Sequence, residues 1–232
     1  MRQNASAVRR PRGRPQLRPD EETRRLVIEA ANAEFQRCGY AGTGMGAVAQ
    51  RAGVSTRTLY RLIPTKADLF TTVVTDRIGH FMLAIDDRAL DALEPAEALQ
   101  RILVAYARLT LSRETIVINR LVIGESDRFP EIAAAYFQHA IVRTTARIAN
   151  WLARETAGGR LDVADPQVAA GVLRGMMVMD PQRLAMRGQC PASTLEEIEE
   201  RARICVTIFL DGCRGRSVTW LAKVEPVLAQ GL

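Results

Sequence analysis

The sequence predicts an all-α protein, in which a small N-terminal three-helix unit is joined by a long helix to a larger helical domain. Three observations support this prediction. The 232 residues are 47% hydrophobic but only 5% aromatic, and Ala, Leu, Arg and Glu are frequent, which is typical of helices. No segment shows the sustained alternation of a strand. Pro95, Pro130, Pro166 and Pro181 each stand near the start of a segment with helical periodicity.

Residues 1–18 are predicted to form a flexible basic arm, because they lack periodicity and combine six arginines with two prolines. The segment Pro11–Pro15, with the sequence PRGRP, resembles the core of an AT-hook. In such an extended segment Arg12 and Arg14 can enter a narrow minor groove, since the glycine between them allows close approach. The alternative is a solvated tail without a bound partner.

The first helix is expected to run from Asp20 to Cys38. Acidic residues at its start suit the positive end of the helix dipole, and Gly39 is expected to end it. Leu26, Ala30 and Ala33 form the stripe that is predicted to face inward.

The stretch from Thr43 to Lys66 indicates two short helices, at about 46–52 and 56–62, separated by a turn at Gly53. Val54 is expected to fill the corner, and Ser55 or Thr56 can cap the second helix. Two helices joined in this way form a helix-turn-helix, whose second helix can lie in the DNA major groove. The candidate base-reading residues are Thr56, Arg57 and Thr58, and the candidate phosphate-contacting residues are Tyr60, Arg61 and Lys66.

The charge distribution favours the same interpretation. Residues 1–70 carry thirteen Arg and Lys against six Asp and Glu, a net charge of +7, whereas the whole chain carries +6. Cation–phosphate attraction supplies most of the sequence-independent affinity for DNA, so a basic N-terminal third is expected of a DNA-binding end.

Residues 65–68 resemble a capping box that opens a long helix reaching the low eighties. The pattern stays helical after it. The predicted units are the arm (1–18), a DNA-binding domain (19–66), a larger helical domain (67–213) and a C-terminal tail (214–232). Further helices are expected near 95–111, 114–125, 130–156, 166–179, 181–186 and 194–212.

Several other classes of protein are disfavoured. The N-terminus lacks the apolar core of a signal peptide and apolar runs are short, so a cytoplasmic protein without a membrane partner is expected. The four cysteines (38, 190, 205 and 213) have no metal-ligand spacing, and the two histidines are isolated. Because no nucleophile elbow, phosphate-binding loop or cluster of catalytic groups occurs, we expect no enzymatic activity, no metal and no cofactor.

The N-terminal unit resembles the tetracycline-repressor (TetR) family of bacterial regulators. The resemblance rests on IEAANAEFQRCGY, on TGMGAVAQRAGVSTRTLYRLIPTK and on ADLF. Downstream, NRLVIGESDRFPEIAAAYF, GRLDVADPQVAA and IFLDGC look like the C-terminal domain of AefR-like members. The resemblance implies a homodimer with one three-helix head per subunit. It also implies that residues 67–213 form a ligand-binding and dimerisation domain, commonly with an inducer pocket.

The chain departs from the family pattern at two places. Gly44-Met45-Gly46 replaces a hydroxyl residue followed by a polar one, so Gly44 and Met45 are expected to face a phosphate through backbone N–H groups only. Ile63-Pro64 stands where an aromatic and a polar residue are usual, and it fits a helix end before Thr65.

These observations predict a ligand-responsive regulator, most simply a repressor, that binds a palindromic operator and is released by a small apolar molecule. The alternative is an architectural DNA-binding protein with weak sequence preference. Candidate ligand-binding residues are Met82, Tyr106, Phe129, Phe137, Met176 and Met177. Candidate dimer contacts, on segments 166–179 and 194–212, are Val172, Met176, Ile198, Ala202, Cys205, Ile208 and Phe209.

Overall fold

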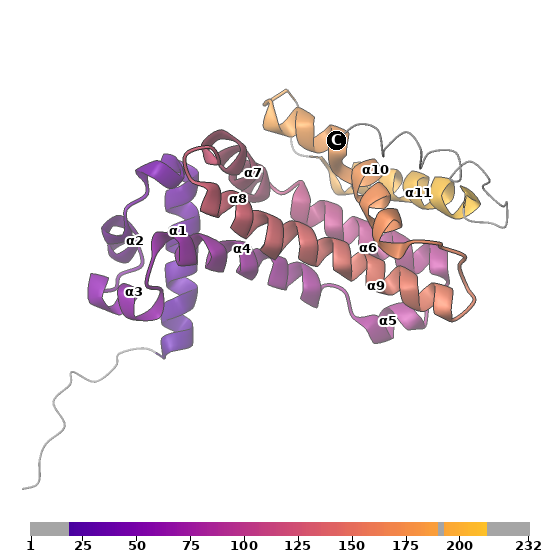
Figure 1. Cartoon of the computed structure of the whole chain (residues 1–232), viewed down its shortest axis with the longest axis horizontal. Coiled ribbons are helices and arrows are strands. Elements are labelled where there is room, and N and C mark those ends of the chain that lie inside the picture. Colours follow the sequence, from indigo (N-terminus) through magenta and orange to yellow (C-terminus); the bar gives the residue numbers. More distant parts are fainter. Residues whose placement is uncertain (1–18, 190–192, 213–232) are drawn as a thin grey trace, which may run out of the picture.

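The computed structural model describes residues 19–189 and 193–212, and within these ranges it holds helices and turns but no strand. The all-α prediction is confirmed. Three helices gather at one end of an elongated molecule as a head, and α4 leads from them into a larger body (Figure 1). The elements are α1 (Asp20–Gly42), α2 (Met45–Arg51), α3 (Thr56–Leu62), α4 (Lys66–Leu83), α5 (Asp87–Asp91), α6 (Pro95–Thr110), α7 (Arg113–Glu125), α8 (Pro130–Tyr136), the π-helical η1 (Phe137–Val142), α9 (Arg143–Ala157), α10 (Pro166–Met186) and α11 (Leu195–Gly212).

The head has its own apolar core. Phe35 of α1, Val48 of α2 and Leu59 of α3 are at most 1% exposed. Phe70 of α4 meets Phe35 edge-on, with 5.6 Å between the ring centroids. This core fixes the angle between α2 and α3, because each short helix buries one apolar side against α1 and α4.

Helix α1 differs from its prediction in detail. Its inward stripe is shifted, since Val27 and Ala31 are fully buried whereas Leu26 and Ala33 are only half-buried. Gly39 does interrupt the helix, with φ 72°, but helical hydrogen bonding resumes for one more turn. A left-handed φ of this kind favours glycine, since it has no Cβ.

Helix α4 belongs to both parts of the molecule. The Oγ1 atom of Thr65 accepts a hydrogen bond from the N–H of Asp68 at 3.0 Å, which confirms the predicted cap. Near its start Leu69 packs in the head, and near its end Phe81 packs in the body. A change in the direction of α4 therefore changes how the head is held relative to the body.

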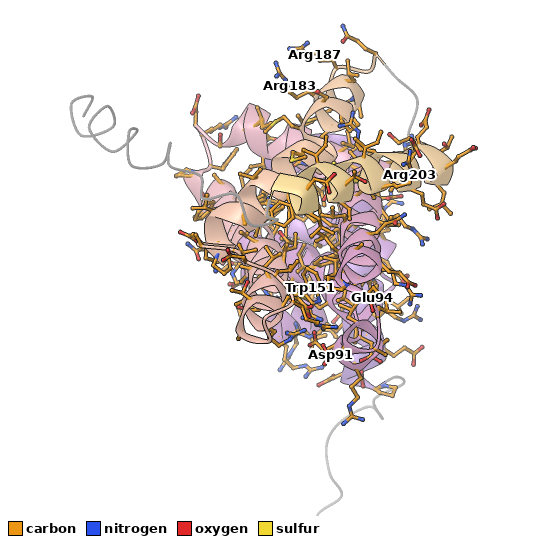
Figure 2. All side chains as sticks on the ribbon, turned by 90° about the vertical axis from the view of Figure 1, so that its right-hand side faces the viewer. Asp91, Glu94, Trp151, Arg183, Arg187 and Arg203 are labelled. Atoms are coloured by element: carbon orange, nitrogen blue, oxygen red, sulfur yellow. The ribbon has the colours of Figure 1, made fainter. Side chains whose placement is uncertain are left out.

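The body consists mainly of α6, α9, α10 and α11. Trp151 and Leu152 of α9, Leu103 of α6 and Leu173 of α10 are fully buried among them. Helix α9 packs along α10, and α6 packs along α11. Figure 2, seen from the body end, shows Trp151 inside this bundle. Among the described helices, none combines the length and the apolarity that a bilayer crossing requires.

Helix α10 corrects one prediction. Two helices were expected at 166–179 and 181–186, but a single helix runs from Pro166 to Met186 with Pro181 inside it. Proline lacks an N–H and disturbs the carbonyls of the preceding turn. Here the carbonyl that loses its helical donor is that of Met177. On the preceding carbonyl, that of Met176, Arg201 of α11 donates from Nη1 at 3.0 Å, so α11 packs on this part of α10.

Two further elements were not predicted. The short helix α5 is capped by Asp86, and Asp87 at its start pairs with Arg147 and Arg154 of α9. The expected single helix over 130–156 is instead α8, η1 and α9 in sequence, with one wide π turn between two α-helical stretches. Both features depend on contacts or backbone geometry beyond the local pattern.

Candidate nucleic-acid interface and ligand cavity

Helix α3 presents part of the predicted base-reading set outward. Ser55 caps it by accepting from the N–H of Thr58 at 3.0 Å, and Leu59 anchors it in the core. Thr56 and Arg57 are exposed. Thr58 is half-buried and its hydroxyl lies 2.8 Å from that of Ser55. Thr56 and Arg57 are therefore the members of the set that stand free for a groove.

The predicted phosphate-contacting residues lie in three different settings. Tyr60 is 50% exposed on the same helix. Arg61 forms a bidentate pair with Asp20 of α1, at 2.9 and 2.6 Å, while its side chain stays 53% exposed. Lys66 is half-buried, and its Nζ donates to the carbonyls of Tyr40 at 2.8 Å and Thr43 at 3.1 Å. In this structure Lys66 stabilises the turn after α1.

The start of α2 lacks a side-chain cap. Gly44 is exposed and offers no side-chain oxygen, and the Met45 side chain is 9% exposed and packs in the head core. Any contact of these two residues with a phosphate would therefore come from backbone N–H groups, as expected from the sequence. Arg12 and Arg14 lie outside the described residues.

A buried carboxylate joins the first two helices of the head. Glu34 of α1 is 3% exposed, and it accepts hydrogen bonds from Arg37 at 2.7 Å and from Arg51 of α2 at 2.6 Å. The hydrogen bonds from Arg37 and Arg51 lower the pKa of this carboxyl. The sequence analysis missed this role, because nothing local to Glu34 indicates that Arg51 will face it.

A second set of contacts joins the head to the corner between α7 and α8. Glu125, the last residue of α7, accepts from the N–H groups of Tyr40 at 2.8 Å and Ala41 at 2.7 Å. The Tyr40 hydroxyl donates to Glu131 of α8 at 3.2 Å, and its ring meets that of Phe129 at 5.0 Å. We call Tyr40, Lys66, Glu125, Phe129 and Glu131 the clasp.

The clasp is partly buried and strongly polar. Burial, together with the hydrogen bond to Glu131, raises the pKa of Tyr40 to about 12. The Lys66 ammonium lies 4.5 Å from the centre of the Tyr40 ring. The clasp therefore holds the end of α1, the start of α4 and the α7–α8 corner together.

A partly enclosed cavity of about 80 Å³ lies between α4, α6, α7, α8, η1, α9 and α10. Its lining mixes apolar side chains with hydroxyl, amide and guanidinium groups. The lining residues are Val74, Arg77, Ile78, Tyr106, Leu109, Thr110, Thr115, Ile118, Asn119, Tyr136, Ala140, Ile141, Thr144, Arg174 and Gln182.

The six predicted ligand-binding residues do not come together in this cavity. Tyr106 lines it. Phe129 belongs to the clasp, Phe137 is 54% exposed, and Met82 packs partly buried between the two cores. Met176 and Met177 line an open groove between α10 and α11. The prediction selected bulky apolar residues, whereas contacts between distant helices decide which side chains surround a cavity.

The chain matches two family descriptions. Residues 27–73 match "Bacterial regulatory proteins, tetR family", and residues 97–212 match "AefR-like transcriptional repressor, C-terminal domain". Among curated proteins, the HTH-type transcriptional regulator ArpR of Pseudomonas putida is 29% identical over 158 residues, which cover 64% of this chain and 75% of ArpR.

Solved structures give the same assignment. A TetR-family transcriptional regulator of Mesorhizobium loti is 28% identical, with a TM-score of 0.73, over 83% of this chain and 97% of the other. The flavonoid-responsive regulator FrrA is 27% identical, with a TM-score of 0.68, over 85% of this chain and the whole of FrrA. The two matched regions together account for the head and most of the body, and the chain belongs to the TetR family of transcriptional regulators, with an AefR-like C-terminal domain.

Proposed function

We propose that this protein is a ligand-responsive repressor that binds a palindromic operator as a homodimer. The observation that carries the proposal is the presentation of α3, where Leu59 is buried while Thr56 and Arg57 face outward. Arg57 forms no ion pair with the described residues, so its guanidinium is available for a guanine edge. Tyr60 and the exposed part of Arg61 stand beside it for phosphate contacts.

The exposed apolar side chains of α10 and α11 support dimerisation through these helices. Val172 is 52% exposed and Ile208 is 58% exposed, and both belong to the set predicted from the sequence. Ile198, Ala202 and Cys205 of the same set are buried within the chain and pack against the body core. The proposed contact surface is the outward stripe of Val168, Val172, Met179, Leu195, Ile204 and Ile208.

The cavity and the clasp suggest how a ligand releases DNA. Thr115 and Asn119 of α7 and Tyr136 of α8 line the cavity, and the same two helices carry Glu125 and Glu131 of the clasp. A ligand that shifts α7 and α8 would therefore change the hold on α1 and α4, and with it the spacing of the two α3 helices. Such a ligand must bind the released geometry better than the DNA-bound one. FrrA, which is by name flavonoid-responsive, supports a ligand-responsive function by similarity.

Selection of genomic fragments by the purified protein tests the proposal. At near-physiological salt we expect a recurrent palindrome whose half-sites lie about 34–36 Å apart. Arg57→Ala is expected to weaken binding to that palindrome by about 1–3 kcal/mol while leaving binding to scrambled DNA nearly unchanged. The control is Arg101→Ala, which removes an exposed arginine of α6 that pairs with Glu97 in the body.

Binding without sequence preference and with a steep salt dependence would instead support the architectural alternative. Equal losses on both DNAs for Arg57→Ala would remove base reading from this residue. A regulator of this kind acts where the chromosome lies, so we place the protein in the cytoplasm.

A further inference from the structure

The charge on the cavity wall is unbalanced. Arg77 of α4 and Arg174 of α10 line the cavity, whereas none of the described residues that line it is acidic. The two arginines come from different helices and face the same small space. Because a cation withdrawn from water is costly without an anion, such a wall favours a negatively charged guest.

Arg174 carries most of this imbalance. It is half-buried, and its hydrogen bonds go to neutral oxygens: Nε donates to the Tyr106 hydroxyl at 3.0 Å, and Nη1 donates to Oγ1 of Thr145 at 2.6 Å. Its guanidinium also lies 5.4 Å from the centre of the Tyr106 ring. No described carboxylate lies within ion-pair distance of it. Arg174 is thus oriented by its neighbours but not neutralised by them.

Arg77 is partly neutralised. Its Nη2 lies 3.2 Å from Glu114 Oε2 and 3.4 Å from the Ser112 hydroxyl, and its side chain is 21% exposed. Its Nε atom is buried and has no hydrogen-bond partner among the described residues. An unpaired buried donor of this kind costs free energy until an acceptor reaches it.

The Tyr136 hydroxyl, which shares the cavity with these arginines, cannot supply the missing negative charge. Tyr136 lines the cavity, and burial raises its pKa to about 12, so its phenol is protonated at neutral pH. The remaining wall contains apolar groups such as Ile78, Leu109 and Ile118. One part of the cavity is therefore cationic and another part is apolar.

We propose that the cavity takes a small organic acid, with its carboxylate at Arg174 and its short aliphatic body against Ile78, Leu109 and Ile118. The proposal rests on the ligand-responsive function above, and it replaces the purely apolar ligand expected from the sequence. Arginine suits this role because its planar fork matches a carboxylate. A volume of about 80 Å³ limits the acid to a few carbons, since it is only about half of the roughly 150 Å³ that holds benzene.

Calorimetric titration of the full chain with matched probes tests this inference. Propionate and butyrate are compared with propanol and butanol, which keep the apolar body but lack the charge. We expect each acid to bind at least about tenfold more tightly than its alcohol, the usual scale for hydrogen bonds to charged groups. Arg174→Gln is expected to weaken the binding of the acids by a similar factor and to leave the binding of the alcohols unchanged.

Two further variants serve as controls. Arg183→Gln changes another arginine of α10, at the outer end of the helix, where Figure 2 shows it pointing away from the body. It is expected to bind both acids as the unmodified chain does. Arg174→Lys keeps the positive charge without the fork and is expected to retain part of the affinity, so it serves if Arg174→Gln does not fold.

Equal affinity for acids and alcohols, no binding of either acid at millimolar concentration, or unchanged acid affinity in Arg174→Gln would each overturn the inference. These results would not affect operator selection, which uses no added ligand. The proposed function fails separately, if the protein selects no operator.

Discussion

At the scale of single residues, Gly39 of α1 packs closely against the Glu125 carboxylate of the clasp. A Cβ placed on Gly39 would lie 2.5 Å from Glu125 Oε1, and the residue has φ 72°. Gly53, in the turn of the helix-turn-helix, has a similar φ of 65° but no neighbouring atom within 4 Å of such a Cβ. The two glycines therefore share the backbone requirement, and only Gly39 adds a close contact.

We expect Gly39→Ala to destabilise the protein more than Gly53→Ala. Each alanine carries the strain of a left-handed residue, about 1–2 kcal/mol. Gly39→Ala must also displace the Glu125 carboxylate, which accepts hydrogen bonds from the backbone N–H groups of Tyr40 and Ala41. Urea unfolding of both variants measures the difference, and equal losses would mean that the Glu125 contact adds nothing.

Because of Glu34, we expect the stability of the head to depend on pH. Its pKa is lowered in the folded state, so it stabilises the fold above its ordinary pKa of 4.5 and loses this effect as the pH falls through the lowered value. The melting temperatures of the unmodified chain and of Glu34→Gln are therefore expected to differ most near neutral pH and to converge in acid. A difference that does not change between pH 7 and pH 3 would contradict the assignment.

The sequence predicted residue roles well where they depend on neighbours along the chain. Ser55 caps α3 and Thr65 caps α4, because a cap needs only the first turn that follows it. Lys66 and Arg61 were predicted to contact phosphates. In the structure Lys66 donates to the Tyr40 carbonyl and Arg61 donates to the Asp20 carboxylate, both on α1. Side chains paired across such distances leave no local signal.

At the scale of elements, the α7–α8 corner connects the cavity to the head. Glu125 of this corner accepts hydrogen bonds from the last turn of α1, and α7 and α8 both contribute residues to the cavity lining. A clasp that depends on the ends of two helices responds to small rotations of either helix. This arrangement makes Glu125 a test of coupling between the two parts of the molecule.

We expect Glu125→Ala to lower the free energy of unfolding by about 1–3 kcal/mol, because two backbone N–H groups lose their acceptor. Operator affinity should fall as well, since the end of α1 is held less firmly. The matched control is Asp127→Ala, which removes an exposed carboxylate at the same corner. Paired denaturation and gel-shift assays measure both effects, and equal behaviour of the two variants would argue against the clasp.

Most helices were predictable from the sequence, since their starts carry caps or prolines. Helix α5 was missed because its five residues depend on Arg147 and Arg154 pairing with Asp87. The continuity of α10 was missed because the sequence shows Pro181 but not the packing of α11 against α10. In both cases packing between distant helices outweighs the local preference.

At the scale of the whole molecule, the proposed dimer sets the distance between the two recognition helices. Val172 of α10 and Ile208 of α11 are both more than half exposed. Exposed apolar side chains on two adjacent helices favour burial against a second copy. One head alone would contact only one half-site.

We expect the double variant Val172→Asp and Ile208→Asp to be a monomer of 25.6 kDa and to lose high-affinity operator binding. Charged groups at the centre of an apolar contact disfavour association. Ile123→Asp is the control, because Ile123 is 68% exposed on α7, which contributes no residue to the proposed surface. Light scattering coupled to size exclusion gives the masses, and a double variant that remains a dimer would disprove this interface.

The wide turn of η1 sets the direction in which the next helix presents its side chains. A π turn holds more residues than an α turn, and each residue of an α-helix turns the chain by about 100°. A continuous α-helix through residues 137–142 would therefore point the side chains of α9 differently around the helix axis. The π turn lets α8 and α9 each keep their own buried side, so that Ile132 and Trp151 are both fully buried.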